Sequence, residues 1–187
     1  MAFWSTSGGT TKDPKRNFRF KVRIEGLSSE GYLWYAKTAT KPSFAIAAAE
    51  HKFLNHTFYY PGSVTWNDVT ITLVDPQNPD SVLGLAKMIQ DGGYKPPGDD
   101  GALKTMSKAS ATNAIKNVEI VQLDAAGEEI ETWKLWNPFV IDAKFGDSLE
   151  YGNDELTELT ITFKYDWAQI ETPAVAGTPI FTAATSA

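Results

Sequence analysis

Strict alternation of apolar and polar residues is the feature that most limits how this chain can fold. Apolar side chains alternate with charged ones between residues 18 and 26, and the same period of two returns in DVTITLVD (68–75) and LTELTITFKYDW (156–167). The first segment has the apolar series Phe18, Phe20, Val22 and Ile24 and the charged series Arg19, Lys21, Arg23 and Glu25. Successive side chains of a β-strand point to opposite faces, so each segment predicts a strand with one buried and one polar face, as in antiparallel sheets.

Further strands are predicted near residues 32–40, 44–60, 114–124, 128–136 and 138–146, with turns at 124–127 and 152–154. One helix is predicted at about 79–91, because Asn78 can cap it, Pro79 suits its first turn and Gly92-Gly93 can end it. Hydrophobic residues make up 42% of the 187 residues, enough for a packed core. The predicted fold is mainly β: an antiparallel β-sandwich or barrel with one flanking α-helix.

The chain divides into an N-terminal arm (1–16), a β domain (17–167) and a C-terminal extension (168–187). Within the domain, residues from about 92 to 111 form a connection longer than structureless loops usually are. The arm is polar but carries Phe3 and Trp4, and the extension carries Ile180 and Phe181. Extensions with isolated aromatic residues often order only against a neighbour, although plain disorder is the simpler alternative.

The letters Gly146-Asp147-Ser148-Leu149 match the name of a class of serine hydrolases. A serine nucleophile needs a base, which this class supplies from an Asp-x-x-His pair late in the chain. The two histidines, His51 and His56, both precede Ser148, and neither has an aspartate three residues before it. The sequence therefore predicts a turn at Ser148 and no catalytic residues.

Nothing in the sequence predicts a metal or cofactor site. His51 and His56 are five residues apart in one predicted strand, so they are expected to face opposite sides. Asp99-Asp100-Gly101 lacks the spaced ligands of a calcium loop, and no phosphate-binding or dinucleotide fingerprint is present. The chain has no cysteine, which fits synthesis in a reducing cytoplasm.

The net charge of −6 argues against tight nucleic-acid binding, which needs a basic surface. No apolar run approaches the length of about 18 residues that spans a bilayer, so no stable membrane association is expected. Two other functions remain open. One is a carbohydrate-binding sandwich that uses rings among Trp34, Tyr35, Tyr59, Tyr60, Trp66, Trp133, Trp136 and Trp167. The other is an enzyme with a base near Ser148 or with a carboxylate pair such as Glu158 and Asp166.

Three stretches, read in order, resemble the tail tube proteins of contractile-tailed bacteriophages, which are related to type VI secretion and bacteriocin tail tubes. They are YAKTATKPS (35–43), WNDVTITLVDP (66–76) and KLWNPFVIDAKFGDSLEYGNDELTELTITFKYDW (134–167). The similarity spans roughly residues 17–167 and lies in the order and spacing of the stretches. The arm, the 92–111 connection and the extension depart from the family pattern.

The resemblance implies a protomer of a hexameric ring. Rings would stack into a tube inside a contractile sheath, with sheath, baseplate and tail terminator proteins as partners and DNA in transient passage. The protein would be made in the host bacterial cytoplasm and reside in the virion tail. Polar strand faces can line a water-filled bore, so Glu158, Thr160, Thr162 and Asp166 are predicted to face the lumen. Contacts between subunits are predicted for Phe3, Trp4, Arg19, Arg23, Tyr94 and Lys95.

Overall fold

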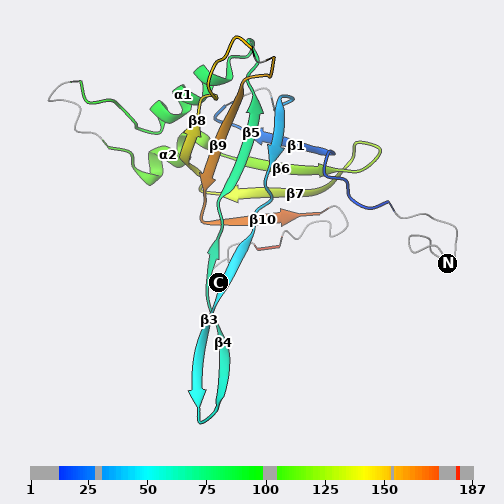
Figure 1. Ribbon diagram of the computed structural model, residues 1–187, viewed down its shortest axis with the longest axis vertical. Helices are drawn as coiled ribbons and strands as arrows, with labels where there is room; N and C mark the ends of the chain where they lie inside the picture. Colours follow the sequence, from blue (N-terminus) through cyan, green and yellow to red (C-terminus); the bar gives the residue numbers. More distant parts are fainter. Residues whose placement is uncertain (1–12, 28–30, 99–104, 153, 173–179, 182–187) are drawn as a thin grey trace, which may run out of the picture.

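In its described residues the chain forms a body of two four-stranded antiparallel sheets and two helices, and a long hairpin that leaves the body at one end (Figure 1). The computed structural model describes residues 13–27, 31–98, 105–152, 154–172 and 180–181. Sheet I has the order β1 (Phe20–Ile24), β6 (Val118–Leu123), β7 (Glu129–Trp136) and β10 (Trp167–Glu171). Sheet II has the order β2 (Ala36–Ala39), β5 (Val69–Val74), β9 (Glu158–Lys164) and β8 (Phe139–Lys144).

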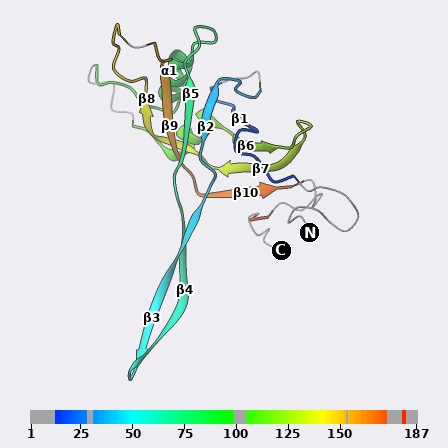
Figure 2. The ribbon, with the colours of Figure 1, turned by 45° about the vertical axis from the view of Figure 1, so that its right-hand side comes forward.

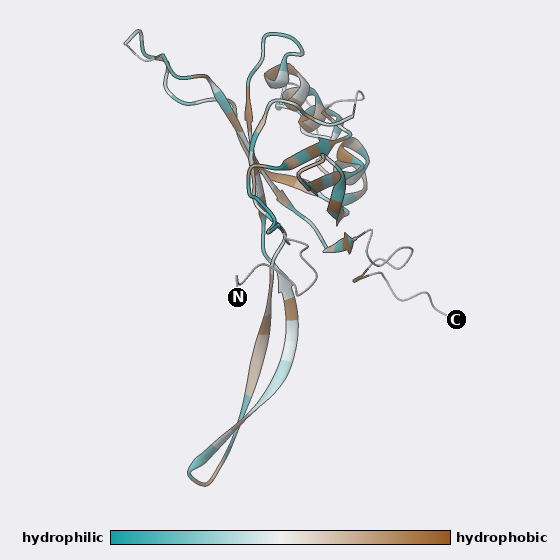
Figure 3. Cartoon of the chain, turned by 90° about the vertical axis from the view of Figure 1, so that its right-hand side faces the viewer, coloured by the Kyte–Doolittle hydropathy of each residue, from teal (hydrophilic) through white to brown (hydrophobic). Residues whose placement is uncertain are grey.

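The predicted alternation decides which faces are buried. Val69, Ile71 and Leu73 of β5 are completely buried, and the residues between them are partly exposed. The alternate residues of β9 behave in the same way, and both strands share one hydrophobic cluster with Val22 and Ile24 of sheet I. Figure 3 shows hydrophobic segments, coloured brown, in the strands of the body. The mainly β, antiparallel fold predicted from the sequence is confirmed.

Helix α1 (Ser81–Asp91) corresponds to the predicted helix, but its cap differs. The Asp80 carboxylate accepts a hydrogen bond from the Leu83 amide at 2.8 Å, so Asp80 is the N-cap and not Asn78. Leu85 and Met88 bury the inner face of α1 against the core cluster. Gly93 follows the helix with a φ of 105°, a conformation that only glycine adopts freely.

A second helix, α2 (Lys108–Ile115), lies where the sequence analysis expected part of a loop and the start of a strand. Ser107 and Ser110 form a capping box, but only Ala111 and Ile115 are buried. Such a short and weakly amphipathic segment gives little periodic signal. As a result β6 begins at Val118, four residues later than predicted, and the body has two flanking helices in its described part.

The predicted strand 44–60 is in fact parts of two strands, β3 (Phe44–Phe53) and β4 (His56–Trp66), which we call the hairpin arm. The chain reverses at Leu54-Asn55, with Leu54 at a φ of 53°. A Leu-Asn pair is not a strong turn signal, so this turn cannot be recognised in the sequence. All ten residues of β3 are exposed. At about 3.4 Å per residue the arm is about 34 Å long, and Figures 1 and 2 show it projecting clear of the sheets.

Candidate assembly surfaces

The outer face of sheet II carries rows of polar side chains that cross all four strands. The register pairs Thr38 with Thr72, Thr72 with Thr160, and Thr160 with Lys144. In the neighbouring row, the hydroxyl oxygens of Thr70 and Thr162 lie 3.3 Å apart, and Asp142 pairs with Thr162. Three of the predicted lumen residues, Glu158, Thr160 and Thr162, therefore share this face, which we call the threonine face.

Charges at the threonine face are balanced and mostly paired. Lys37 forms an ion pair with Glu158, and the hydrogen bond between them raises the pKa of Lys37. Lys164 Nζ lies 2.7 Å from Asp68 Oδ1. Because opposite charges neutralise one another locally, such a surface attracts neither anions nor cations strongly.

Asp166, the fourth predicted lumen residue, lies beyond the end of β9. Its carboxylate accepts hydrogen bonds from Lys108 at 2.7 Å and from Asn137 at 2.8 Å. The hydrogen bond from Lys108 is the main reason why the pKa of Asp166 is lowered. Asp166 thus ties α2 to the bend between β9 and β10, and the structure does not bring it together with the other three.

The residues predicted to contact other subunits are spread over the body. Arg23 of β1 lies 3.3 Å from Glu25 and 3.8 Å from Glu119, on the outer face of sheet I. Arg19 stacks on the ring of Phe18, and Tyr94 and Lys95 are exposed after α1. Phe3 and Trp4 lie outside the described residues.

Tyr94 borders an apolar groove of about 380 Å³ between the two helices and the edge strand β8. The groove is lined mainly by Met88, Ile89, Met106, Ala111, Val140 and Phe145. Phe145 and Met106 are 46% and 44% exposed, so this surface is open to a partner.

An ionic cluster around the buried Glu131 of β7 was not predicted from the sequence. Its side chain is 8% exposed, and it accepts hydrogen bonds from Lys15, Lys41 and the indole of Trp133, the last two at 2.6 Å. Burial alone would raise the pKa of Glu131, but these donors outweigh it and lower the pKa to about 2. The cluster therefore attaches Lys15 of the N-terminal arm, and Lys41 in the segment before β3, to sheet I. Lys41 belongs to the TKPS stretch that carries the family resemblance, which is the one signal that marked it.

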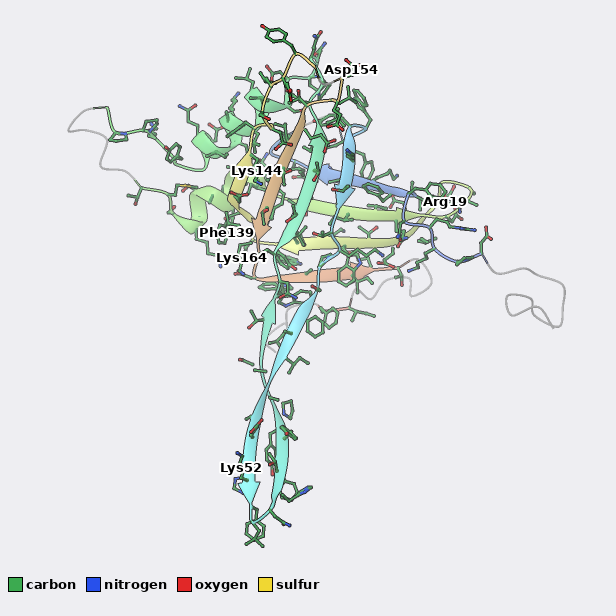
Figure 4. All side chains as sticks on the ribbon, viewed as in Figure 1. Arg19, Lys52, Phe139, Lys144, Asp154 and Lys164 are labelled. Atoms are coloured by element: carbon green, nitrogen blue, oxygen red, sulfur yellow. The ribbon has the colours of Figure 1, made fainter. Side chains whose placement is uncertain are left out.

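Ser148 lies in the connection between β8 and β9, beside a cavity of about 100 Å³. Small-molecule sites usually measure several hundred Å³. None of the described residues that line this cavity is a histidine. Figure 4 shows the nearby Asp154 at one end of the molecule and Lys52, next to His51, at the other. The two histidines are therefore far from Ser148.

The expectation that His51 and His56 face opposite sides is wrong, because the turn separates them into two strands. The register pairs His51 with Phe58 and Phe53 with His56, which puts all four on one face of the hairpin arm. The His56 and Phe58 rings are 4.7 Å apart. Among the described residues no group of three or more His, Asp or Glu side chains is placed to hold a metal ion, and no helix could span a membrane.

The aromatic residues do not form a common sugar platform in the described part of the chain. Tyr35 is 5% exposed, the Trp133 indole is bonded to Glu131, and Trp136 stacks on Trp167 with ring centroids 5.5 Å apart. Tyr59 and Tyr60, adjacent in β4, point to opposite faces of the hairpin arm.

No protein family model matches the sequence, and no curated protein matches it. Solved structures do match the fold. A chain of the anti-feeding prophage cap, which terminates a tube, has a TM-score of 0.66 at 17% identity, over 92% of this chain and 99% of that one. A chain of the PVC sheath/tube terminator in the extended state has a TM-score of 0.65 at 16% identity, over 87% and 100%.

A chain of the PVC sheath–tube complex, an extracellular contractile injection system, has a TM-score of 0.61 at 15% identity, over 85% of this chain and 92% of that one. These values establish a shared fold across nearly the whole of each matched chain. The resemblance to contractile tail tubes found in the sequence is confirmed at this level: the protein has the fold of chains from the tubes and caps of contractile injection systems.

Proposed function

We propose that this protein is a structural subunit of the tube of a contractile tail, in which hexameric rings stack into a hollow conduit. The observation that carries the proposal is the form of sheet II. It has a polar outer face, and in the described part of the chain β2 and β8 each pair on one side only.

Free sheet edges favour joining of copies into a ring. Pairing β8 of one copy with β2 of the next would satisfy the backbone groups of both edges and leave no edge open in a closed ring. Six four-stranded sheets give a barrel of about two dozen strands, wide enough for a water-filled channel. The threonine face would line that channel, with Glu158, Thr160 and Thr162 at the wall.

The balanced charge of the threonine face suits passage of cargo. A lining that bound phosphate groups tightly would hold DNA in place, whereas paired charges and hydroxyl groups offer no fixed anion site. In a phage the cargo would be the genome during ejection. In a related injection device the same lining would pass a protein.

Stacking of rings would use the hairpin arm. A two-stranded hairpin is marginally stable alone in water. Phe53, Phe58, Tyr59 and Tyr60 are between 45% and 66% exposed on this one. Burial of these rings against a second copy in the next ring would stabilise both the arm and the stack.

The outer surfaces would meet the other tail proteins. Sheath, baseplate and tail terminator subunits are the proposed partners. The proposed contact areas are the apolar groove beside Tyr94 and Lys95, and the outer face of sheet I around Arg19 and Arg23. Phe3 and Trp4 of the N-terminal arm are proposed to contribute further contacts. The protein would reside in the tail of a virion or a virion-like particle after synthesis in the bacterial cytoplasm.

Negative-stain electron microscopy of the purified protein over a range of concentrations tests the proposal. Hexameric rings or tubes are the expected result. A protein that stays monomeric at every concentration, and also when mixed with preformed tail baseplates, would refute it. Retention of such a monomer on a polysaccharide column would favour the carbohydrate-binding alternative.

The position of the threonine face can be tested by chemical labelling, because the chain has no cysteine of its own. In assembled tubes we expect Thr160→Cys to react with a polymer-linked maleimide at least about tenfold more slowly than in the monomer, since the channel excludes the polymer. Ala126→Cys, in the exposed turn between β6 and β7, is the control and should react equally fast in both states. Equal rates for Thr160→Cys in tube and monomer would place this face outside the lumen.

A further inference from the structure

The base of the hairpin arm carries an aromatic platform whose occupant comes from the C-terminal extension. Phe44 and Trp66 are the first and last residues of the arm, a register pair with ring centroids 5.0 Å apart. The Trp66 ring lies 5.9 Å from that of Tyr165, a residue of the body that is 5% exposed. Phe181 lies edge-on to both Phe44 and Trp66, with centroids 5.8 Å away in each case.

The residue before Phe181 is bound to sheet I. Ile180 and Ile170 exchange two backbone hydrogen bonds, of 3.0 and 3.2 Å, which extend the sheet along the side of β10 that has no other strand partner among the described residues. Residues 180–181 therefore join two parts of the molecule: the edge of sheet I through the backbone, and the base of the arm through the Phe181 ring.

We infer that residues 180–181 act as a clasp that fixes the direction of the hairpin arm relative to the body. The strands β3 and β4 contact chiefly each other, so the direction of the arm is set at its base. The base is otherwise held by the Phe44–Trp66–Tyr165 rings and by Ser43, which accepts hydrogen bonds from Asn67 at 2.8 and 2.9 Å. Because the arm is about 34 Å long, a swing of about 10° at the base moves its tip by about 6 Å.

The clasp has two consequences. If the tip of the hairpin arm binds a neighbouring copy, the clasp would hold the tip in position before assembly. Less conformational entropy would then be lost when that contact forms. Ile180 also covers part of an exposed strand edge that could otherwise pair with another chain. The first consequence rests on the proposed function, whereas the clasp itself does not.

Distance measurements on the dilute, unassembled full chain test the clasp. Spin labels at Asn55→Cys, on the turn of the arm, and Ala126→Cys, on the body, report the direction of the arm through pulsed dipolar spectroscopy. We expect a narrow distance distribution in the parent, one at least twice as wide in Phe181→Ala, and a narrow one again in Phe181→Tyr, which keeps the ring.

Ile180→Pro removes the amide that donates to Ile170 and should widen the distribution in the same way. Truncation after residue 181 is the matched control and should leave it narrow. Circular dichroism shows whether each variant is folded, which is expected because Phe181 is 46% exposed. A distribution as narrow as the parent's in folded Phe181→Ala overturns the inference. The distance measurement uses the unassembled chain, so a narrow distribution in Phe181→Ala would not contradict the proposed function. Conversely, a parent protein that fails to form rings or tubes would not contradict the clasp.

Discussion

Replacing residues 47–63 by Asn-Gly should leave rings intact and abolish their stacking. The Ile46–Val64 pair would then close a two-residue hairpin, and Asn-Gly is the sequence that such turns prefer. The body should keep its stability, because the removed residues of β3 are exposed and none of residues 47–63 belongs to the hydrophobic core cluster. Loss of burial for the four exposed rings Phe53, Phe58, Tyr59 and Tyr60 should raise the concentration needed for stacking by at least about 1000-fold. Light scattering and electron microscopy give the concentration at which polymers appear.

A pair of matched variants shows whether the arm acts through its side chains. Phe53→Ser with Phe58→Ser alters the face of the arm that also carries the histidines, and Lys52→Ser with Thr57→Ser alters the opposite face at the same level. The first variant should weaken stacking strongly and the second only slightly. Stacking that survives the shortened arm would show that rings adhere through their bodies alone.

The central strands of sheet II, β5 and β9, could be predicted from the sequence because each has one buried face and one partly exposed face, whereas β6 in sheet I is buried on both faces. In β5 and β9 the period of two is unbroken, and buried and partly exposed residues alternate as predicted. The arm gives no such signal of its own, since both of its faces are exposed in the single chain. Its aromatic residues were visible in the sequence, but their arrangement depends on a turn at Leu54-Asn55 that lacks the usual glycine.

The polar sites could be predicted from the sequence only where their residues belong to one strand. Glu158, Thr160 and Thr162 share a face because they are two residues apart in one strand, and spacing alone establishes that. Asp166 has the same parity, but the strand ends at Lys164 and the parity argument ends with it. The Glu131 cluster joins residues 15, 41 and 131, and contacts between such distant positions depend on sheet order, which no local pattern contains.

Glu131→Gln should lower the free energy of unfolding at pH 7 by about 3 kcal/mol, the value that corresponds to a pKa lowered from 4.5 to about 2. The neutral amide would leave Lys15 and Lys41, whose side chains are about half exposed, without the buried carboxylate that they bind. Glu129→Gln is the matched control on the same strand. Glu129 also binds a lysine, Lys21 at 3.1 Å, but its side chain is 43% exposed, so this loss should stay below about 1 kcal/mol.

The dependence on pH distinguishes lost charge pairing from lost packing. The folded-state pKa of Glu131 lies below its ordinary value, so its contribution is complete above about pH 5 and disappears as the pH falls from about 4.5 towards 2. Denaturant titrations of parent and variant at pH 7 and pH 3 should therefore show the difference in unfolding free energy narrowing by about 2 kcal/mol. A difference that stays the same at both pH values would mean that the glutamine disturbs the packing of sheet I. The hydrogen bonds from Lys15 and Lys41 to Glu131 would then contribute little to holding the N-terminal arm and the base of the hairpin arm on the body.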